Sequence, residues 1–571
     1  MRVYLMSWED IHDMRHLTHE ADFCVVGGGL AGLCAAIAAA RHGAKTVLMH
    51  DRPVLGGNCS SEIRMWICGA HGTGNKETGL LEEIQLANLV RNPTMNYSVW
   101  DSALYEKAMA EPNLTLLLNC SCCDAAMDGS KIASVKGWLG TAETWHTVRA
   151  NYFADCSGDA ILAPLTGAEY RVGREGRAEF GESIAPEQPD RKTMGMSCLM
   201  QLRDTGRPQE FTPPAWAYQY PTDADLPQAS HGLGTNFWWI ELGGEGDSIH
   251  DTEALRDEML KIAFGVWDHI KNHGDHSAEN YALEWLGFLP GKRESRRCVG
   301  DYMLTQHDIE AGGPFGDIVA YGGWSMDDHF PAGFRYRGGH PTIYHPAPSP
   351  YGIPYRCLYS KNIENLYFAG RNISVTHAAL SSTRVMGTCA LLGQAAGTAA
   401  ALAVRENCSP REVDIRQLQR TLMADDCWLP GLRQLVQDFV VPGHALTNGY
   451  DRGVENAWVC RAGDSVEIPF TRPVQLSQIR IVFDSDLDDP KRMPHIWPLG
   501  EHRRGLPGCL VKSYTLSALT GGAWVELASV GDNHRRLAVH PVDCAAEALR
   551  LTVHASHGAE EFRVFSVYAE G

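Results

Sequence analysis

The chain has 571 residues, of which 44% are hydrophobic and 21% are charged, and its formal net charge is -19 at pH 7. A chain of this length is too long for a single hydrophobic core, so we expect roughly two to four domains. The acidic balance disfavours nucleic acid and anionic membrane surfaces as partners.

The N-terminal stretch MRVYLMSWEDIHDMRHLTHEADF contains acids and histidines where a secretory signal needs an unbroken apolar region. No apolar window approaches the roughly 20 residues that a membrane-spanning helix needs. Cys120 and Cys123 form a C-x-x-C pair, but they fit strand positions better than a redox or zinc site. We therefore expect a cytoplasmic protein with reduced thiols.

Residues 22–50 predict a strand at 23–26, a glycine turn, a helix at 30–41 and a second strand at 46–49. This βαβ pattern favours a parallel sheet. Gly27, Gly29 and Gly32 have the G-x-G-x-x-G spacing between the first strand and the helix, and Asp51 follows 19 residues after Gly32. The glycines permit a tight turn and close approach of a diphosphate, while the acid accepts hydrogen bonds from a ribose. The sequence predicts a dinucleotide site here.

The middle of the chain predicts two kinds of structure. Residues 112–160 favour strands, with a turn at Asp128 and Gly129. Residues 190–350 are rich in aromatic residues, glycine and proline, which suits an inserted, substrate-facing domain. Within them, a helix begins after Asp251 and ends near Gly274.

A second segment favours FAD over NAD as the dinucleotide. Residues 365–403 predict a short strand, then Ala369-Gly370-Arg371, then a helix of small residues. Such a helix can direct its N-terminus at a flavin. A further helix is expected within 410–426. From about residue 440 the sequence pattern changes to short predicted strands separated by Gly, Pro and Asp, which indicates an all-β sandwich.

Four blocks support this interpretation: the glycine loop continuing to RPVLGGNCSSE, DCSGDA at 155–160, LPGKRESRRCVGDY at 289–302, and the stretch from IPYRCLYSKN to LLGQAAG. In this order they resemble the FAD-dependent oxidoreductase family related to fumarate reductase and succinate dehydrogenase flavoproteins. More narrowly, they resemble a bacterial group associated with carbohydrate degradation.

The resemblance implies an α/β fold with an FAD-binding, Rossmann-like domain of the glutathione-reductase type at 1–190 and 351–407. A mixed α+β substrate or cap domain is expected at 191–350, a helical linker at 408–440, and a jelly-roll sandwich similar to discoidin and galactose-binding domains at 441–571. Trp458 and the loop HIWPLGEHRRGLPG are candidates for a sugar-binding shelf. A domain that only packs on the enzyme or forms a homo-oligomer remains an equal alternative.

The resemblance also implies the cofactor site. Asp51 stands where the family usually has glutamate, and Ser157 where it has threonine. The absence of the family's S-H-T pattern predicts that the flavin is not covalently linked. The cofactor-binding residues implied are Gly27, Gly29, Leu30, Ala31, Gly32, Asp51, Arg52, Gly56, Gly57, Asn58, Ser157, Gly158, Asp159, Gly370, Arg371, Gly387 and Thr388.

The candidates for chemistry are polar residues next to these blocks, each with a structural role as the alternative. His377 is the first choice as general acid or base, because it precedes the small-residue helix. The full set is His377, Arg384, His71, Arg64, Asp328 and His329. We expect no metal site, because Asp327, Asp328, His329, His340 and His345 form no recognised ligand pattern. The charged run at 292–297 predicts a buried network of Arg293, Glu294, Arg296 and Arg297.

The leading hypothesis is FAD-dependent oxidation of a secondary hydroxyl on a sugar, glycoside or polyol. The alternatives are reduction of an activated alkene, as in fumarate reductase, and a flavin-holding carbohydrate-binding protein without catalysis. A small-molecule substrate is expected, and the sequence does not identify the electron acceptor, since it contains neither a second dinucleotide loop nor an iron–sulfur cysteine pattern.

Overall fold

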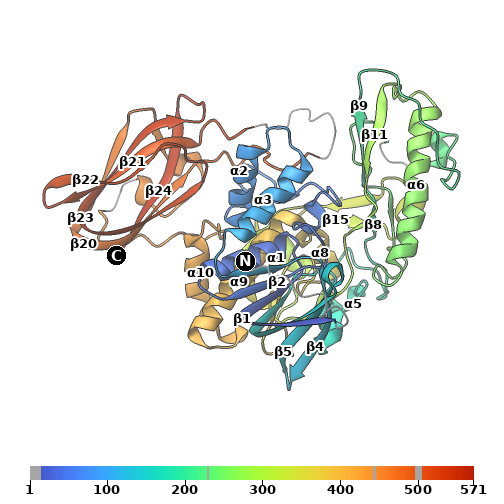
Figure 1. The fold of residues 1–571 in the computed structure, drawn as a ribbon, viewed down its shortest axis with the longest axis horizontal. Coiled ribbons are helices and arrows are strands. Elements are labelled where there is room, and N and C mark those ends of the chain that lie inside the picture. Colours follow the sequence, from blue (N-terminus) through green and yellow to red (C-terminus); the bar gives the residue numbers. More distant parts are fainter. Residues whose placement is uncertain (1–13, 228–230, 442–444, 495–504) are drawn as a thin grey trace, which may run out of the picture.

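A computed structural model describes residues 14–227, 231–441, 445–494 and 505–571. Figure 1 shows a central α/β body, a lobe on one side that carries α6 (Thr252–Asn272), and a β domain on the opposite side that contains the C-terminus. The predicted α/β fold with an all-β C-terminal region is confirmed.

The central sheet has seven strands in the order β3-β2-β1-β6-β5-β4, with β18 paired to β6. Neighbours β3, β2, β1, β6 and β18 run parallel, whereas β4, β5 and β6 form an antiparallel meander. The strands are β1 (Arg15–Val26), β2 (Thr46–Met49), β3 (Leu114–Leu117), β4 (Cys120–Asp128), β5 (Lys131–Leu139), β6 (Thr144–Asp155) and β18 (Leu366–Phe368). The first strand begins earlier than predicted, because its initial half is partly exposed and carries no apolar run.

Two almost fully buried helices lie against each other beside this sheet, α1 (Leu30–Arg41) and α9 (Met386–Glu406). A Cβ on Gly393 or Gly397 would overlap the carbonyl oxygens of Ala31 and Ala35, so these glycines permit the close crossing. The other helices of the body are α2 (Leu80–Arg91), α3 (Tyr97–Met109), α4 (Leu162–Thr166), α8 (His377–Thr383) and α10 (Ile415–Ala424).

The expectation of no membrane-length apolar segment needs a correction for α9. Among the described residues, this one helix is long and apolar enough to cross a membrane by length and composition, yet 94% of its apolar window is buried inside the protein. Its apolar surface is already covered by the helix α1 and the sheet.

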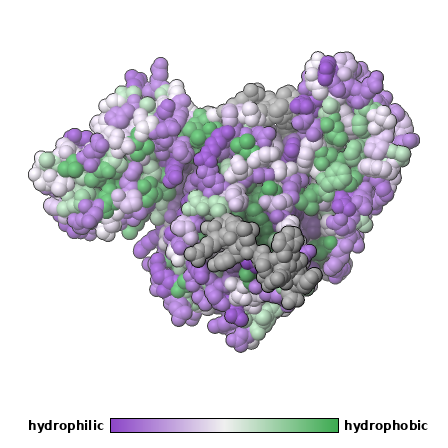
Figure 2. Space-filling model, viewed as in Figure 1, coloured by the Kyte–Doolittle hydropathy of each residue, from purple (hydrophilic) through white to green (hydrophobic). Residues whose placement is uncertain are grey.

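The lobe contains α6 and small sheets, and its core includes Phe237, Trp239 and Trp267. Hydrophilic residues cover much of the face seen in Figure 2, and hydrophobic residues gather on part of this lobe. The lobe's strands are β8 (Met196–Ser197), β9 (Met200–Asp204), β10 (Glu241–Leu242), β11 (Tyr281–Leu286) and β12 (Gly291–Lys292). The remaining short elements are β7 (Tyr170–Arg171), α5 (Arg177–Phe180), β13 (Arg297–Cys298), α7 (Gln306–Glu310), β14 (Ile318–Gly322), β15 (Met326–His329), β16 (Thr342–His345) and β17 (Tyr351–Pro354).

The C-terminal region is a six-stranded antiparallel sheet in the order β19-β24-β20-β23-β21-β22. Register shifts in the long pair β20–β23 allow the sheet to bend around its own core. The strands are β19 (Trp458–Cys460), β20 (Ser465–Phe483), β21 (Val511–Thr520), β22 (Ala523–Val530), β23 (Leu537–Ser556) and β24 (Phe562–Glu570). Trp458 is half-buried against this core, and residues 495–504 of the proposed sugar-binding shelf lie outside the described residues.

Candidate functional site

One large cavity extends from the glycine loop after β1 to the junction of the body with the α6 lobe. Sixteen of the predicted site residues line it. They are Gly27, Gly29, Leu30, Ala31, Asp51, Arg52, Gly56, Gly57, Asn58, Ser157, Gly158, Asp159, Gly370, Arg371, His329 and Arg384.

The glycine loop forms the first wall of this cavity. Gly27 has a φ of +104°, in the left-handed region that favours glycine, and a Cβ there would strike the backbone of Cys156. Gly29 is the N-cap of α1 and has no side-chain capping bond, so the helix N-terminus opens toward the cavity. Such an N-terminus suits a diphosphate. Gly32 is not among the lining residues, and a Cβ on it would overlap the Gly27 carbonyl oxygen.

The buried side chain of His50 fixes the conformation of the glycine loop through two hydrogen bonds. The Gly28 N–H donates to His50 Nδ1 at 2.9 Å, and His50 Nε2 lies 3.0 Å from the Val54 carbonyl oxygen. Since a carbonyl only accepts, Nε2 carries the proton and the ring fixes the loop. Asp51, the next residue, lines the cavity with a side chain that is 57% exposed, as a ribose-binding carboxylate requires.

Asp159 anchors the opposite wall through a network of charges. Its carboxylate accepts hydrogen bonds from Lys292 Nζ at 2.8 Å, Ser295 Oγ at 2.7 Å and Arg371 Nη2 at 2.6 Å. Burial favours the neutral acid, but Arg371 and Lys292 outweigh burial and hold the pKa of Asp159 well below its usual range. This wall therefore presents an ordered ionic network to the cavity.

Four cavity residues carry buried N–H groups that have no hydrogen-bond acceptor among the described residues. These groups are Arg52 Nη1, Trp324 Nε1, Arg371 Nε and Arg384 Nε. Buried donors without an acceptor are costly, so a ligand rich in acceptor atoms fits this cavity. FAD, with its diphosphate, ribose and flavin oxygens, meets that requirement, and the glycine loop and Asp51 match its adenosine diphosphate half.

A cluster of buried polar residues forms the end of the cavity next to the lobe. His329 Nδ1 lies 2.7 Å from Glu241 Oε2, while its Nε2 is 3.4 Å from Asp327 Oδ1, beyond ordinary hydrogen-bond length. Arg384 Nη2 donates to the Asp327 backbone oxygen at 3.0 Å, and Arg293 Nη1 lies 3.4 Å from Glu241. His329, Asp327, Arg384 and Arg293 all line the cavity.

The electrostatics of this cluster keep its carboxylates ionised. Burial favours neutral Glu241, but Arg293 and His329 outweigh it and lower the Glu241 pKa. His329 and Arg384 lower the pKa of Asp327 in the same way, against the effect of burial. Burial, reinforced by Asp327, raises the pKa of Tyr344 to about 12, so this phenol in the cavity wall keeps its proton.

His377 lies outside the residues that line the cavity. Its Nδ1 is 2.9 Å from Glu294 Oε2 and its Nε2 is 3.2 Å from Asp328 Oδ1. Burial opposes its charge, but Glu294 and Asp328 outweigh burial and raise the pKa of His377 to about 10. Because His377 is not among the lining residues, it does not suit the role of a base that must reach a substrate in the cavity. Asp328, which holds it, is likewise not a lining residue.

The remaining candidates from the sequence, Arg64, His71, Gly387 and Thr388, are not among the residues that line the cavity. Arg64 stacks over Trp285 at 4.5 Å and donates to Gln201 at 3.0 Å. His71 stacks on the cavity residue Trp324, with ring centroids 4.4 Å apart, and is not itself among the lining residues. Gly387 backs onto Glu77, and the structure places neither Gly387 nor Thr388 among the lining residues; Val385, Met386 and Cys389 line the cavity there instead.

The charged run after Pro290 is largely the buried network that the sequence predicted. Arg293, Glu294 and Arg297 are buried, and Arg297 pairs with Glu175 at 2.9 Å. Arg296 is only half-buried and donates to the Asp159 backbone oxygen at 3.2 Å.

Several residues that line the cavity were not predicted as site residues from the sequence, among them Trp238, Lys292, Trp324 and Tyr344. Trp238 and Trp324 occur in the aromatic- and glycine-rich segments FWWIELGG and YGGWSMDD, which was the available signal. Glu241, which orients His329, carried no signal of its own, because it comes from a different strand.

A family model described as FAD dependent oxidoreductase matches residues 22–422. No curated protein sequence matches the chain. The solved structure of E. coli quinol fumarate reductase FrdA is similar at 12% identity over 71% of this chain and 74% of its own, with a TM-score of 0.28. Mycobacterium smegmatis Sdh1 is similar at 12% identity over 71% of this chain and 72% of its own, with a TM-score of 0.28.

For the C-terminal region, the family 32 carbohydrate-binding module of Streptococcus pneumoniae EndoD is similar at 18% identity over 24% of this chain and 95% of its own, with a TM-score of 0.18.

The match to the FAD dependent oxidoreductase family model covers well over half of the chain and includes the glycine loop, Asp159 and Arg371. The chain therefore belongs to the FAD-dependent oxidoreductase family, as its motifs predicted.

Proposed function

We propose that this FAD-dependent oxidoreductase oxidises a secondary hydroxyl of a sugar, glycoside or related polyol. FAD, when bound, supplies the hydride acceptor. The residues of the chain then have to bind the alcohol, remove its proton and stabilise charge on its oxygen.

The observation that carries this proposal is the arrangement of His329 at the cavity. Glu241 accepts the Nδ1–H at 2.7 Å, so in the neutral ring, the form that can take up a proton, the lone pair is on Nε2, the nitrogen nearer Asp327. A buried carboxylate that orients an imidazole in this way supports a general base. The hydroxyl proton would pass to His329 Nε2, and Glu241 would stabilise the resulting imidazolium.

Arg384 and Arg293 supply positive charge to the same end of the cavity. The Arg384 Nε–H has no acceptor among the described residues, so it is available to an oxygen of the substrate. Burial lowers the pKa of Arg293, and Glu241 counters this effect at 3.4 Å. Donors placed at a developing negative charge stabilise it in a dry site.

The lining also suits a sugar. Trp238, Trp324 and Tyr344 line the cavity beside the polar cluster. Apolar faces with a few fixed polar groups are the usual composition of small-molecule sites, and the C–H faces of a sugar pack on aromatic rings. The electron acceptor that reoxidises the flavin is proposed to be a quinone or a partner protein.

Reduction of an activated alkene is the second candidate, because Arg293 and Arg384 line the cavity beside the polar cluster and an arginine can act as the acid. Anaerobic mixing of the FAD-loaded protein with sugars, glycosides and polyols separates the two. Bleaching of the flavin absorbance by one of these alcohols, with a ketone as product, is the expected result. Failure of every alcohol to bleach it, together with reoxidation of the reduced protein by an enoate, would replace this proposal with the second candidate.

A further inference from the structure

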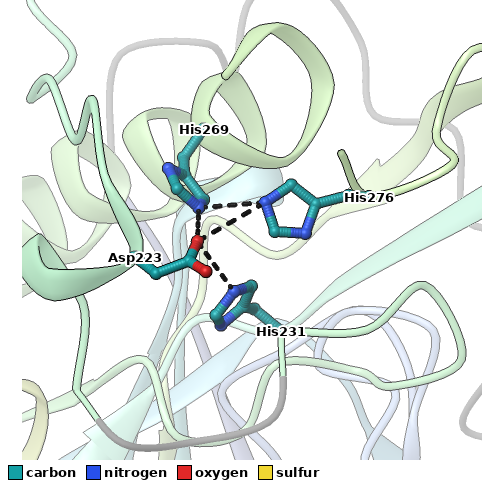
Figure 3. Close-up of side chains that lie close together, drawn as sticks. All are labelled: Asp223, His231, His269 and His276. Atoms are coloured by element: carbon teal, nitrogen blue, oxygen red, sulfur yellow. Dashed lines mark hydrogen bonds and ion pairs between the residues drawn. The ribbon is translucent and has the colours of Figure 1, made fainter. Parts of the chain in front are cut away.

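Three histidines and one aspartate converge on the α6 lobe, outside the residues that line the FAD cavity (Figure 3). Asp223 opens the short helix η4 (Asp223–Asp225), His269 lies in the last turn of α6, and His231 and His276 come from connecting segments. One ligand atom from each of the four residues lies within 4.8 Å of the others.

The separations resemble the edges of a coordination tetrahedron. Asp223 Oδ1 is 2.9 Å from His269 Nε2, 3.6 Å from His231 Nε2 and 3.7 Å from His276 Nε2. The Nε2 atoms of His269 and His276 are 3.1 Å apart. A tetrahedral ion with bonds of about 2.0–2.1 Å has edges of about 3.3 Å, so small side-chain shifts suffice to admit one.

The tautomer of His269 supports a cation at this point. Its Nδ1 lies 2.7 Å from the Tyr220 carbonyl oxygen, which can only accept, so Nδ1 carries a proton. In the form in which Nδ1 carries the only proton of the ring, the lone pair of Nε2 is directed at a carboxylate oxygen and at a second imidazole nitrogen. A cation between them turns this repulsion into attraction, and a backbone carbonyl on the other ring nitrogen is the usual support of a metal-binding histidine.

The segments that carry the cluster are ordered by other contacts. His269 is almost fully buried on α6. Lys271 Nζ donates to the carbonyl oxygens of Ala278, Glu279 and Tyr281 at 2.7–2.9 Å, which fixes the segment after His276 on the helix end. Thr222 and Asp225 form a capping box around Asp223. Asp223, His269 and His276 therefore lie on or next to segments that contacts other than the ion hold in place.

We infer that Asp223, His231, His269 and His276 bind one Zn²⁺ ion. Imidazole nitrogen and carboxylate oxygen are ligands that Zn²⁺ accepts in tetrahedral sites. Four protein ligands leave no open position for a substrate, so the ion serves structure. It joins η4, the segment at His231 and the end of α6, and thereby stabilises the lobe whose Trp238 lines the cavity. This inference does not depend on the substrate proposed above.

The test uses the full-length, FAD-loaded protein after treatment with a chelator. Titration with Zn²⁺, followed by gel filtration and metal analysis, should give one ion per chain. Replacement by Co²⁺ should give the intense visible absorption of a tetrahedral site, and Zn²⁺ should raise the midpoint of thermal unfolding.

Asp223→Asn and His276→Gln should each weaken Zn²⁺ binding at least tenfold and abolish the thermal shift, while FAD content reports that the variants are folded. Asp223 is exposed, so its substitution spares the core. His273→Gln, on the same segment but outside the cluster, and Cys123→Ser, in the C-x-x-C pair, are the matched controls and should bind as the wild type does. A wild-type protein that retains no Zn²⁺, or equal binding by Asp223→Asn and the wild type, would overturn the inference.

Discussion

Gly393 of α9 lies directly on the carbonyl oxygen of Ala31 in α1, with no room for a Cβ between them. Gly397 repeats this contact one turn later, on Ala35. The contact joins the helix that opens at the dinucleotide loop to the helix whose first turn lines the far part of the cavity. The two parts of the cavity proposed to hold FAD, far apart in sequence, are thereby fixed relative to each other.

Gly393→Ala should therefore lower both stability and FAD retention. The added methyl group meets backbone rather than a movable side chain, so a loss of about 1–3 kcal/mol in the free energy of unfolding is expected. Urea denaturation and the ratio of flavin to protein absorbance measure the two effects. Gly316→Ala is the control, because nothing lies near its Cβ position and its φ is not positive. Equal stability of the two variants would contradict the role assigned to Gly393.

The sequence predicted individual helices and strands well, but it did not predict which residues far apart in the chain lie together at the site. The helix bounds at 30–41 and the strand at 46–49 are confirmed, because their apolar runs and Gly43 are local signals. The polar end of the cavity combines Glu241 from β10, His329 from β15 and Arg384 from the end of α8. The spacing of these residues in the sequence does not predict that the three elements lie together.

His377 illustrates the same limit. Its position just before the small-residue helix suggested a place at the flavin, but its contacts with Glu294 and Asp328 decide where the ring points. The sequence also did not predict the cluster of Asp223, His231, His269 and His276, because these residues are spread from 223 to 276 and His269 lies on the buried face of α6. Long-range packing, rather than local pattern, determines both.

His329→Gln should abolish most of the turnover while leaving the FAD content unchanged. Loss of a positioned general base costs about 10²–10⁴-fold in kcat. Glu241→Gln keeps a hydrogen-bond acceptor near Nδ1 but removes the charge, so a smaller loss in kcat is expected. Single-turnover bleaching of the flavin by the identified alcohol measures both effects.

The control for this pair is His71→Gln, which alters a histidine behind Trp324 rather than one in the cavity wall. It should keep kcat close to the wild-type value. If His71→Gln loses as much activity as His329→Gln, the base is wrongly assigned.

The charge on His377 should make stability depend on pH on the alkaline side of neutrality. Its pKa is raised from 6.5 to about 10 in the folded protein, so its stabilising contribution is complete below pH 6.5 and is lost as the pH rises toward 10. Within this window the wild type should lose up to about 1.4 kcal/mol per pH unit relative to His377→Gln. Urea denaturation at several pH values measures the difference, with His554→Gln as an exposed control that should parallel the wild type. Parallel curves for the wild type and His377→Gln would show that His377 is not charged when folded.

A buried ion pair docks the C-terminal sheet on the body. Arg536 Nε lies 3.0 Å from Asp426 Oδ2, and the two side chains are 2% and 6% exposed. Arg536→Met leaves Asp426 buried without its partner, so a loss of about 3–5 kcal/mol is expected, with earlier release of the sheet by limited proteolysis. Arg461→Met breaks an exposed pair with Glu561 in the same sheet and should cost less than about 1 kcal/mol. Burial raises the pKa of Asp426 to about 6 even beside Arg536, so without the arginine this carboxyl group takes up a proton and stays buried without its partner. Adding Asp426→Leu to Arg536→Met should therefore restore part of the stability. A double variant no more stable than Arg536→Met would instead assign the loss to the packing of the arginine side chain.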